Sequence, residues 1–159
     1  MNQLYLLLGS NQQQPQKQLL LAQKSITKII GKTLRKSAIY KTAAWGNTQQ
    51  PDFLNQVIVV ETKFTAVQTM QAILTIEKNM GRIRNKKNDP RIIDIDILFF
   101  NKEIIDSTHL TVPHPQLQNR NFVLIPLNEL SPNFKHPVLH KTVHQLLRVS
   151  PDKLTVNKI

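Results

Sequence analysis

Two aspartates lie two positions apart in the most apolar segment of this 159-residue chain. In Ile93-Asp94-Ile95-Asp96-Ile97, a β-strand would place the three isoleucines on one face and both aspartates on the other. Carboxylates roughly 7 Å apart repel each other by about 2–3 kcal/mol at an effective dielectric near 20. A cation would relieve this repulsion, and carboxylates with phosphate oxygens and water suit Mg²⁺. The alternative is a half-exposed strand that carries two hydrated carboxylates.

A basic segment comes directly before the two aspartates. It contains Arg82, Arg84, Lys86, Lys87 and Arg91. Guanidinium groups bind phosphate oxygens through paired hydrogen bonds. A run of charges by itself is usually a hydrated loop. Next to a carboxylate–metal site, however, cations are what a polyphosphate substrate requires, so the two features together predict phosphate binding.

Glu77 lies on the apolar stripe of a predicted helix, where a leucine is expected. A carboxylate that points toward a sheet requires a partner, such as an arginine or a ligand hydroxyl. The alternative is a glutamate at the edge of the stripe that reaches water. The apolar residues of this stripe are Val67, Met70, Ile73, Leu74 and Met80.

The surrounding pattern predicts the elements that position these residues. Apolar runs predict strands at 4–8, 33–41, 57–60 and 92–100, and helical spacing predicts helices at 15–31 and 65–81. Further helices are expected from about 119 and over 140–148. The order βαββαβ is typical of a ferredoxin-like α+β sheet with helices packed on one face, here followed by a C-terminal extension. Gly9-Ser10-Asn11 lacks the pattern of a P-loop and predicts a turn with a helix cap.

Composition limits the classes of protein that this chain can belong to. The length fits one domain over residues 1–159. The absence of cysteine excludes a disulfide scaffold, a thiolate nucleophile and Cys-based zinc sites. The net charge of +11 predicts an anionic partner: nucleic acid, a nucleotide or an acidic membrane. The apolar runs have strand length, and the N-terminus lacks the features of a signal peptide, so we expect a cytoplasmic protein.

Five segments, in this order, resemble the 6-hydroxymethyl-7,8-dihydropterin pyrophosphokinase family. The two most specific are the Arg-x-x-Asp-x-Asp-Ile and Leu-Thr-Val-Pro-His sequences, each of which would be weak alone. The resemblance runs from about residue 3 to 130. Its segments are Leu8–Asn11, Pro51–Asn55, Glu77 with Gly81–Arg84, Pro90–Ile97, and Leu110–His114 with Asn119–Phe122.

The resemblance implies a ferredoxin-like fold and a reaction of folate biosynthesis. ATP would donate its β,γ-diphosphoryl group to the hydroxymethyl oxygen of the reduced pterin, with release of AMP. Two Mg²⁺ ions would be bound by Asp94 and Asp96. The implied partners are the small molecules ATP and reduced pterin, so we expect a monomer with neither a nucleic-acid nor a membrane partner.

The resemblance also implies residue roles. The implied catalytic residues are Arg82, Arg91, Asp94 and Asp96. The implied nucleotide-binding residues are Glu77, Arg84, Arg91, Ile97, Thr111, His114 and Arg120. The pterin would meet backbone groups, an amide and two aromatic rings; these substrate-binding residues are Thr42, Ala43, Trp45, Phe53, Asn55 and Phe122.

Two alternatives remain at this stage. The family usually has Trp-Gly before the Pro-Arg of its second lid, whereas Asn88-Asp89 precede Pro90 here, so one alternative is a lid-impaired, weakly active family member. The other is a basic RNA-binding ferredoxin-like module, which would need exposed aromatic rings on its central strands. Tyr5 and Phe99 are the aromatic residues in those strands, and they are isolated in sequence.

Overall fold

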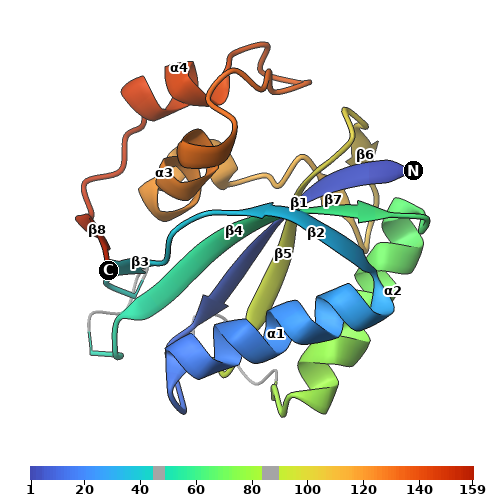
Figure 1. The fold of residues 1–159 in the computed structure, drawn as a ribbon. Helices are drawn as coiled ribbons and strands as arrows, with labels where there is room; N and C mark the ends of the chain where they lie inside the picture. The colour runs from blue at the N-terminus through green and yellow to red at the C-terminus, as the bar shows by residue number, and fades with distance from the viewer. Residues whose placement is uncertain (45–48, 84–89) are drawn as a thin grey trace.

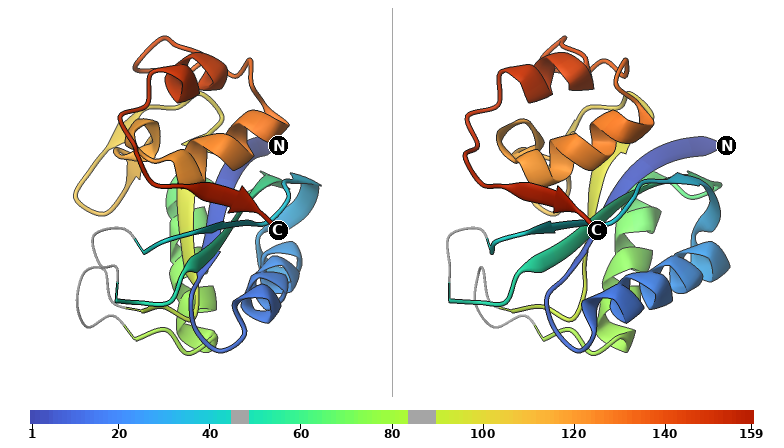
Figure 2. Two further views of the ribbon diagram at one scale, coloured as in Figure 1. Left: turned by 90° about the vertical axis from the view of Figure 1, so that its left-hand side faces the viewer. Right: turned by 60° about the vertical axis from the view of Figure 1, so that its left-hand side comes forward.

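The chain folds into three layers in a computed structural model that describes residues 1–44, 49–83 and 90–159. Helices α1 (Pro15–Ile29) and α2 (Ala66–Asn79) cover one face of a central sheet, and α3 (Asn121–Leu130) and α4 (Val143–Arg148) cover the other (Figures 1 and 2). The sheet contains β1 (Asn2–Ser10), β2 (Gly31–Lys36), β3 (Tyr40–Thr42), β4 (Phe53–Thr62), β5 (Asp94–Phe100) and β8 (Val156–Lys158). A separate hairpin pairs β6 (Ile105–Asp106) with β7 (Thr111–Val112), and a short 3-10 helix spans Leu117–Asn119.

The strand order is β5-β1-β4-β3-β8, with β2 also paired to β4, and every pairing between these strands is antiparallel. The strand predicted over 33–41 is two strands, which is a correction. Between them, the amide of Ser37 donates to the carbonyl of Val57, and its hydroxyl accepts from the Val57 amide at 3.0 Å. Because a side chain replaces a backbone acceptor at this point, the regular ladder is interrupted.

Strand β1 is the centre of the core, as its apolar residues predict. Leu4, Leu6 and Leu8 face the layer of α1 and α2, whereas Tyr5 and Leu7 belong to the cluster beneath α3 and α4. Hydrophobic burial on both faces therefore holds the three layers together. The prediction of helices on one face only is wrong, because the C-terminal helices cover the second face.

The ends of the helices follow local signals. Pro15 occupies the first turn of α1, and Thr65 and Gln68 form the predicted capping box of α2. Gly81, with φ of 94°, follows α2 in a left-handed conformation that favours glycine. Gly31 does not end α1 in this way; it opens β2, where a Cβ atom would lie 2.0 Å from the carbonyl oxygen of Glu61. Close approach of β4 is what requires glycine there.

The predicted C-terminal extension packs back onto the sheet. Strand β8 pairs with β3, and α4 begins with a second capping box, formed by Thr142 and Gln145. Among the described residues, no helix combines the length and the apolarity needed to cross a membrane.

Candidate active site

The register of three strands assembles the polar residues of the site. Gly9 on β1 lies opposite Asp94 on β5 and opposite Asn55 on β4. Two residues earlier, Leu7 lies opposite Asp96. Because paired residues project to the same side of a sheet, these side chains share one face, beneath α3. Ile93, Ile95 and Ile97 occupy the opposite face in the core, as predicted.

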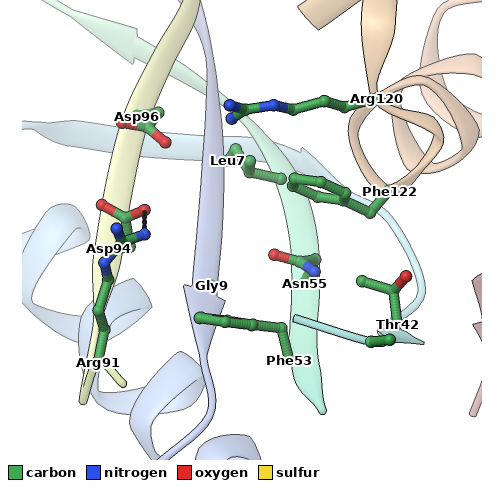
Figure 3. A pocket seen from close by; sticks show the side chains of 11 residues that line it. Leu7, Gly9, Thr42, Phe53, Asn55, Arg91, Asp94, Asp96, Arg120 and Phe122 are labelled. Atoms are coloured by element: carbon green, nitrogen blue, oxygen red, sulfur yellow. Dashed lines mark hydrogen bonds and ion pairs between the residues drawn. The ribbon is translucent and has the colours of Figure 1, made fainter. Parts of the chain in front are cut away.

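A cleft opens above this face, between β5, β1, β4 and the start of α3. Figure 3 shows Asp94 and Asp96 on one side of it and Asn55 with Thr42 on the other. In that view, Phe122 and Phe53 lie on opposite sides of Asn55, and the guanidinium of Arg120 extends toward Asp96. The lining residues are Leu7, Gly9, Thr42, Ala43, Phe53, Asn55, Arg91, Asp94, Asp96, Arg120 and Phe122.

Asp94 is held by two arginines. Arg82 Nη1 lies 2.8 Å from Asp94 Oδ1, and Arg91 Nη1 lies 3.1 Å from Asp94 Oδ2. The same Arg82 nitrogen also lies 2.5 Å from Glu77 Oε2, and that oxygen accepts the amide of Ile95 at 2.9 Å. Glu77 is buried, so the prediction that it needs a partner is confirmed, and the partner is Arg82. Attraction to Asp94 and Glu77 outweighs burial and raises the pKa of Arg82.

Asp96 has different surroundings from Asp94. Within the described part of the chain, its carboxylate makes no hydrogen bond and no salt bridge. Burial, followed by repulsion from Asp94 and Glu77, raises its pKa well above the usual range. A divalent cation would offset both effects. Oxygen ligands suit Mg²⁺, and the described residues offer no third His, Cys, Asp or Glu for a closed metal cluster, which leaves positions for phosphate oxygens and water.

Asn55 presents an unused donor to the cleft. It is buried, and its Nδ2 atom has no hydrogen-bond partner among the described residues. On its other side, a Cβ atom at Gly9 would lie only 2.8 Å from Asn55 Oδ1. Glycine at this position therefore leaves the space that the amide occupies. A buried donor without a partner is unfavourable unless a ligand supplies an acceptor.

A second, larger groove runs along the edge of β5, between α2 and the β6–β7 hairpin. Asp96 lines both this groove and the first cleft, so the two cavities adjoin at this residue. The groove is lined by Val67, Met70, Gln71, Ile73, Leu74, Glu77, Ile95, Asp96, Ile97, Ser107, His109, Leu110, Thr111 and His114.

The predicted apolar stripe of α2 is wrong in part. Val67 and Leu74 are 50% and 45% exposed and line the groove instead of the core. Thr69 and Ile76 are buried in their place. The row of small and β-branched residues turns toward the sheet, so the neighbouring row of larger side chains is left to form a wall of the groove.

His114 at the end of the groove is neutral. Burial, and then the charge of Arg120, lowers its pKa to about 4. Its Nδ1 atom accepts the amide of Gln116 at 3.1 Å, so the ring proton resides on Nε2. His114 can therefore donate a hydrogen bond to an anion, although it carries no charge at neutral pH.

The predicted site residues separate between the two cavities. All the described substrate-binding candidates line the first cleft: Thr42, Ala43, Phe53, Asn55 and Phe122. Four nucleotide-binding candidates line the groove: Glu77, Ile97, Thr111 and His114. Arg91 and Arg120 line the cleft instead, and Arg82 reaches the site through Asp94. Trp45, Arg84 and Asn88-Asp89 lie outside the described residues.

Sequence reasoning missed several residues of both cavities. Leu7 and Gly9 belong to the cleft because β1 pairs with β5, and their alternation with Leu8 is the signal that could have placed them. The groove residues Gln71, Ser107 and His109 had no such signal, because their positions depend on how α2 and the hairpin pack. The predicted helix cap at Ser10 and Asn11 is also wrong, since the N-cap of α1 is Gln14, without a side-chain cap.

The RNA-binding alternative is not favoured. Tyr5 and Phe99 are 4% and 1% exposed, because the C-terminal layer covers their face of the sheet. They pack edge to face at a centroid distance of 5.8 Å and cannot stack on bases.

Comparisons with known proteins agree on one family. Residues 5–132 match the family described as 7,8-dihydro-6-hydroxymethylpterin-pyrophosphokinase (HPPK). Two similar relatives are named 2-amino-4-hydroxy-6-hydroxymethyldihydropteridine pyrophosphokinase: one from Synechocystis, 38% identical over 71% of this chain and 57% of its own length, and one from Haemophilus influenzae, 33% identical over 92% and 98%. The chain covers 20% of the folic acid synthesis protein fol1 of Schizosaccharomyces pombe, at 37% identity.

A solved structure supports the fold. The crystal structure of Plasmodium falciparum HPPK-DHPS with pteroate superposes with a TM-score of 0.75 at 20% identity, over 92% of this chain and 42% of that one. The mixed α/β architecture with an antiparallel sheet is therefore that of HPPK domains. With the matched segment and the relatives above 30% identity, this likeness means that the chain belongs to the 7,8-dihydro-6-hydroxymethylpterin-pyrophosphokinase family.

Proposed function

We propose that the chain transfers the β,γ-diphosphoryl group of ATP to the hydroxymethyl group of 6-hydroxymethyl-7,8-dihydropterin and releases AMP, a step of folate biosynthesis. The observation that carries this proposal is the shared position of Asp96. A cleft suited to a flat heterocycle and a groove suited to a nucleotide adjoin at this residue. Two substrates that bind in adjoining cavities would bring their reacting groups together at that point.

The pterin would occupy the cleft above β4. Its polar edge would accept a hydrogen bond from the unpaired Nδ2 atom of Asn55 and meet backbone groups of Thr42 and Ala43. Phe53 and Phe122 would bind its two faces, because flat apolar rings suit a flat heterocycle. The hydroxymethyl group would then point toward Asp94 and Asp96.

The nucleotide would occupy the groove along β5. Apolar side chains of α2, with Ile97 and Thr111, would contact the base and sugar. The Nε2 proton of His114 would donate to a phosphate oxygen, and the guanidinium groups of Arg91 and Arg120 would face the triphosphate from the cleft.

In the reaction, the substrate hydroxyl would release its proton to water, and its oxygen would form a bond to the β-phosphorus. The bond between that phosphorus and the oxygen bridging to the α-phosphate would break, and AMP would leave with the electron pair. Two Mg²⁺ ions held by Asp94 and Asp96 would neutralise the triphosphate and lower the pKa of the substrate hydroxyl. Arg82 and Arg91 would orient Asp94 and compensate charge that develops on the transferred group. Glu77 would act through Arg82, which it contacts directly.

The proposal also includes a ferredoxin-like arrangement of the strands and a single domain. The sheet order β5-β1-β4-β3 supports a ferredoxin-like arrangement of the first part of the chain. Residues 1–159 would act as one domain, since the C-terminal segment pairs with β3. The proposal also includes a monomeric enzyme.

The test is the identity of the nucleotide product. The protein is mixed with ATP, Mg²⁺ and 6-hydroxymethyl-7,8-dihydropterin, and AMP and ADP are separated by chromatography. We expect AMP and the pterin diphosphate, with both lost in Asp94→Ala and Asp96→Ala. Production of ADP would mean transfer of the γ-phosphate and would overturn the proposal. Lys153→Ala, an exposed position away from both cavities, is the control that keeps activity.

A further inference from the structure

The last ten residues, beyond the segment that matches the family, contact two elements that line the substrate cleft, β3 and the start of α3. Strand β8 pairs with β3, with Val156 opposite Thr42 and Lys158 opposite Tyr40. The hydroxyl of Thr42, a cleft residue, donates to the carbonyl of Thr155 at 3.2 Å. Figure 2 shows this segment passing from α4 along α3 to the edge of the sheet. One wall of the cleft is therefore supported by the C-terminal segment.

Asp152 makes the most specific contacts of this segment. Its Oδ2 atom accepts the backbone amide of Asn121, the first residue of α3, at 2.8 Å. Its Oδ1 atom accepts the amide of Leu154 at 2.9 Å, and its carbonyl accepts Asn121 Nδ2 at 3.4 Å. Both carboxylate oxygens are thus engaged, one by the helix and one by the segment's own backbone.

The start of α3 needs such an acceptor. The first amides of a helix have no partner within the helix, and Arg120 at the N-cap supplies no side-chain hydrogen bond. A carboxylate there satisfies one amide and interacts favourably with the positive end of the helix dipole. Asp152, thirty-one residues away in sequence, supplies the hydrogen-bond acceptor that the N-cap side chain of a helix usually supplies.

The residues on either side of Asn121 are both site residues. Arg120 and Phe122 line the cleft, and the Arg120 guanidinium carbon lies 5.8 Å from the centre of the Phe122 ring. Burial lowers the pKa of Arg120, and the negative charge of Asp152 is among those that oppose this shift. The group that holds the amide of Asn121 therefore restrains the backbone from which both side chains project.

We propose that Asp152 is a positioning residue of the substrate site, which fixes the start of α3 so that Arg120 and Phe122 face the cleft. The inference rests on the proposed function for the identity of the substrates. The competing explanation is that Asp152 only stabilises the fold. That explanation predicts an unchanged KM in a variant that remains folded.

The experiment compares Asp152→Ala, Asp152→Asn and the control Lys153→Ala, each shown by circular dichroism to be folded at the assay temperature. For Asp152→Ala we expect the KM for the pterin to rise by about 10-fold. Asp152→Asn keeps an acceptor for the Asn121 amide and should recover most of this loss. Lys153→Ala should stay within about 2-fold of the parent protein. If Asp152→Ala lowers the unfolding temperature but leaves the KM unchanged, the role is structural and the proposal is overturned.

A second measurement needs no turnover. In ¹H–¹⁵N spectra of the free protein, the Arg120 Nε and Phe122 amide signals should shift in Asp152→Ala and stay near their original positions in Lys153→Ala. Unchanged signals would overturn the positioning role even if the enzyme is active. A parent protein that releases no AMP, but whose two signals shift as expected, would contradict the proposed function and support the role of Asp152.

Discussion

Asp94 and Asp96 have the same side-chain chemistry and opposite electrostatic environments. Asp94 is paired with Arg82 and Arg91, whereas Asp96 accepts no hydrogen bond from the described residues. The partners of Asp94 compensate its charge within the protein. The charges of Arg82 and Arg91 offset the burial of Asp96 only in part. Its position therefore lowers the stability of the free protein and favours the protein with a bound cation.

This difference predicts opposite effects of two matched substitutions. In EDTA, Asp96→Asn should raise the free energy of unfolding by about 1–2 kcal/mol. Burial raises the pKa of Asp96 to about 8, so the aspartate must take up a proton or bury a charge on folding at pH 7, whereas the amide does neither. Asp94→Asn should lower the free energy of unfolding by about 1–2 kcal/mol, because two ion pairs are lost. Both variants should lose at least about 100-fold in kcat. Urea unfolding at pH 7 provides the check, and a destabilised Asp96→Asn would contradict the argument.

Gly9 contributes to the site through its lack of a side chain, which leaves room for the amide of Asn55. Gly9→Ala would place a methyl group 2.8 Å from Asn55 Oδ1 and displace the amide that faces the cleft. We expect the KM for the pterin to rise by about 10-fold, and the KM for ATP to change by less than about 2-fold. Asn55→Ala should have a similar effect, and the double variant should be no worse than either single one. Additive losses would mean that Gly9 acts elsewhere.

Among the elements, the cleft depends on segments that are distant in sequence. Asn11, at the end of β1, is buried and links two of them. Its Oδ1 atom accepts the amide of Arg91 at 2.8 Å, and its Nδ2 atom donates to Gln50 Oε1 at 3.0 Å and to the carbonyl of Pro51 at 3.2 Å. The Asn11 backbone amide also donates to the carbonyl of Arg91 at 3.1 Å. The side chain and backbone of this residue together set the separation between the start of β4 and the approach to β5.

Loss of this link should affect the binding of both substrates. Asn11→Ala leaves the Arg91 amide without its acceptor, which predicts a loss of about 1–3 kcal/mol in stability. It should also lower kcat/KM by about 10-fold, since Arg91 then keeps only the bond from the Asn11 backbone amide to its carbonyl and the ion pair with Asp94. Asn11→Asp keeps the acceptor and loses the donor, so it should lose less activity when steady-state rates are compared. Equal losses of activity in the two variants would show that the hydrogen bond from the Arg91 amide to Asn11 Oδ1 does not account for the effect on activity.

At the scale of the whole molecule, two neutral histidines in the C-terminal half make the free energy of unfolding depend on pH. Burial lowers the pKa of His114 to about 4, and burial with repulsion from His140 also lowers that of His136. In each ring Nδ1 accepts backbone amides, from Gln116 in one case and from Val138 and Leu139 in the other. Protonation would remove these acceptors.

The sign of the resulting pH dependence follows from proton binding. Between the ordinary histidine pKa near 6.5 and the lowered values, the unfolded chain binds more protons than the folded one, so stability falls as the pH falls. We expect a slope of at most about 1.4 kcal/mol per pH unit for each histidine below pH 6.5, and none from these groups above it. Asp96, whose pKa is raised, contributes a slope of the opposite sign in this range. Urea unfolding from pH 7.5 to 4.5 is therefore compared between the parent protein and a histidine variant, so that the contribution of Asp96 cancels. The slope should be smaller in His136→Asn, and an unchanged slope would contradict the assignment.

The sequence by itself determined the features that depend on short-range periodicity. Alternation places Asp94 and Asp96 on one face, a capping box starts α2, and a carboxylate on an apolar stripe signals that Glu77 needs a partner. These features follow from backbone geometry over a few residues, so no knowledge of the fold is required.

Only the tertiary structure decided which distant groups meet. The rotation of α2, which turned Val67 and Leu74 into the wall of a groove, depends on packing against β5. The position of Asp96 between two cavities depends on strand pairing, and the contact of Asp152 with Asn121 depends on the return of the C-terminus to the sheet. Such contacts are decided by how whole layers pack against each other. They leave no repeating pattern in the sequence, because a contact between two distant residues does not dictate the types of the residues that flank either of them.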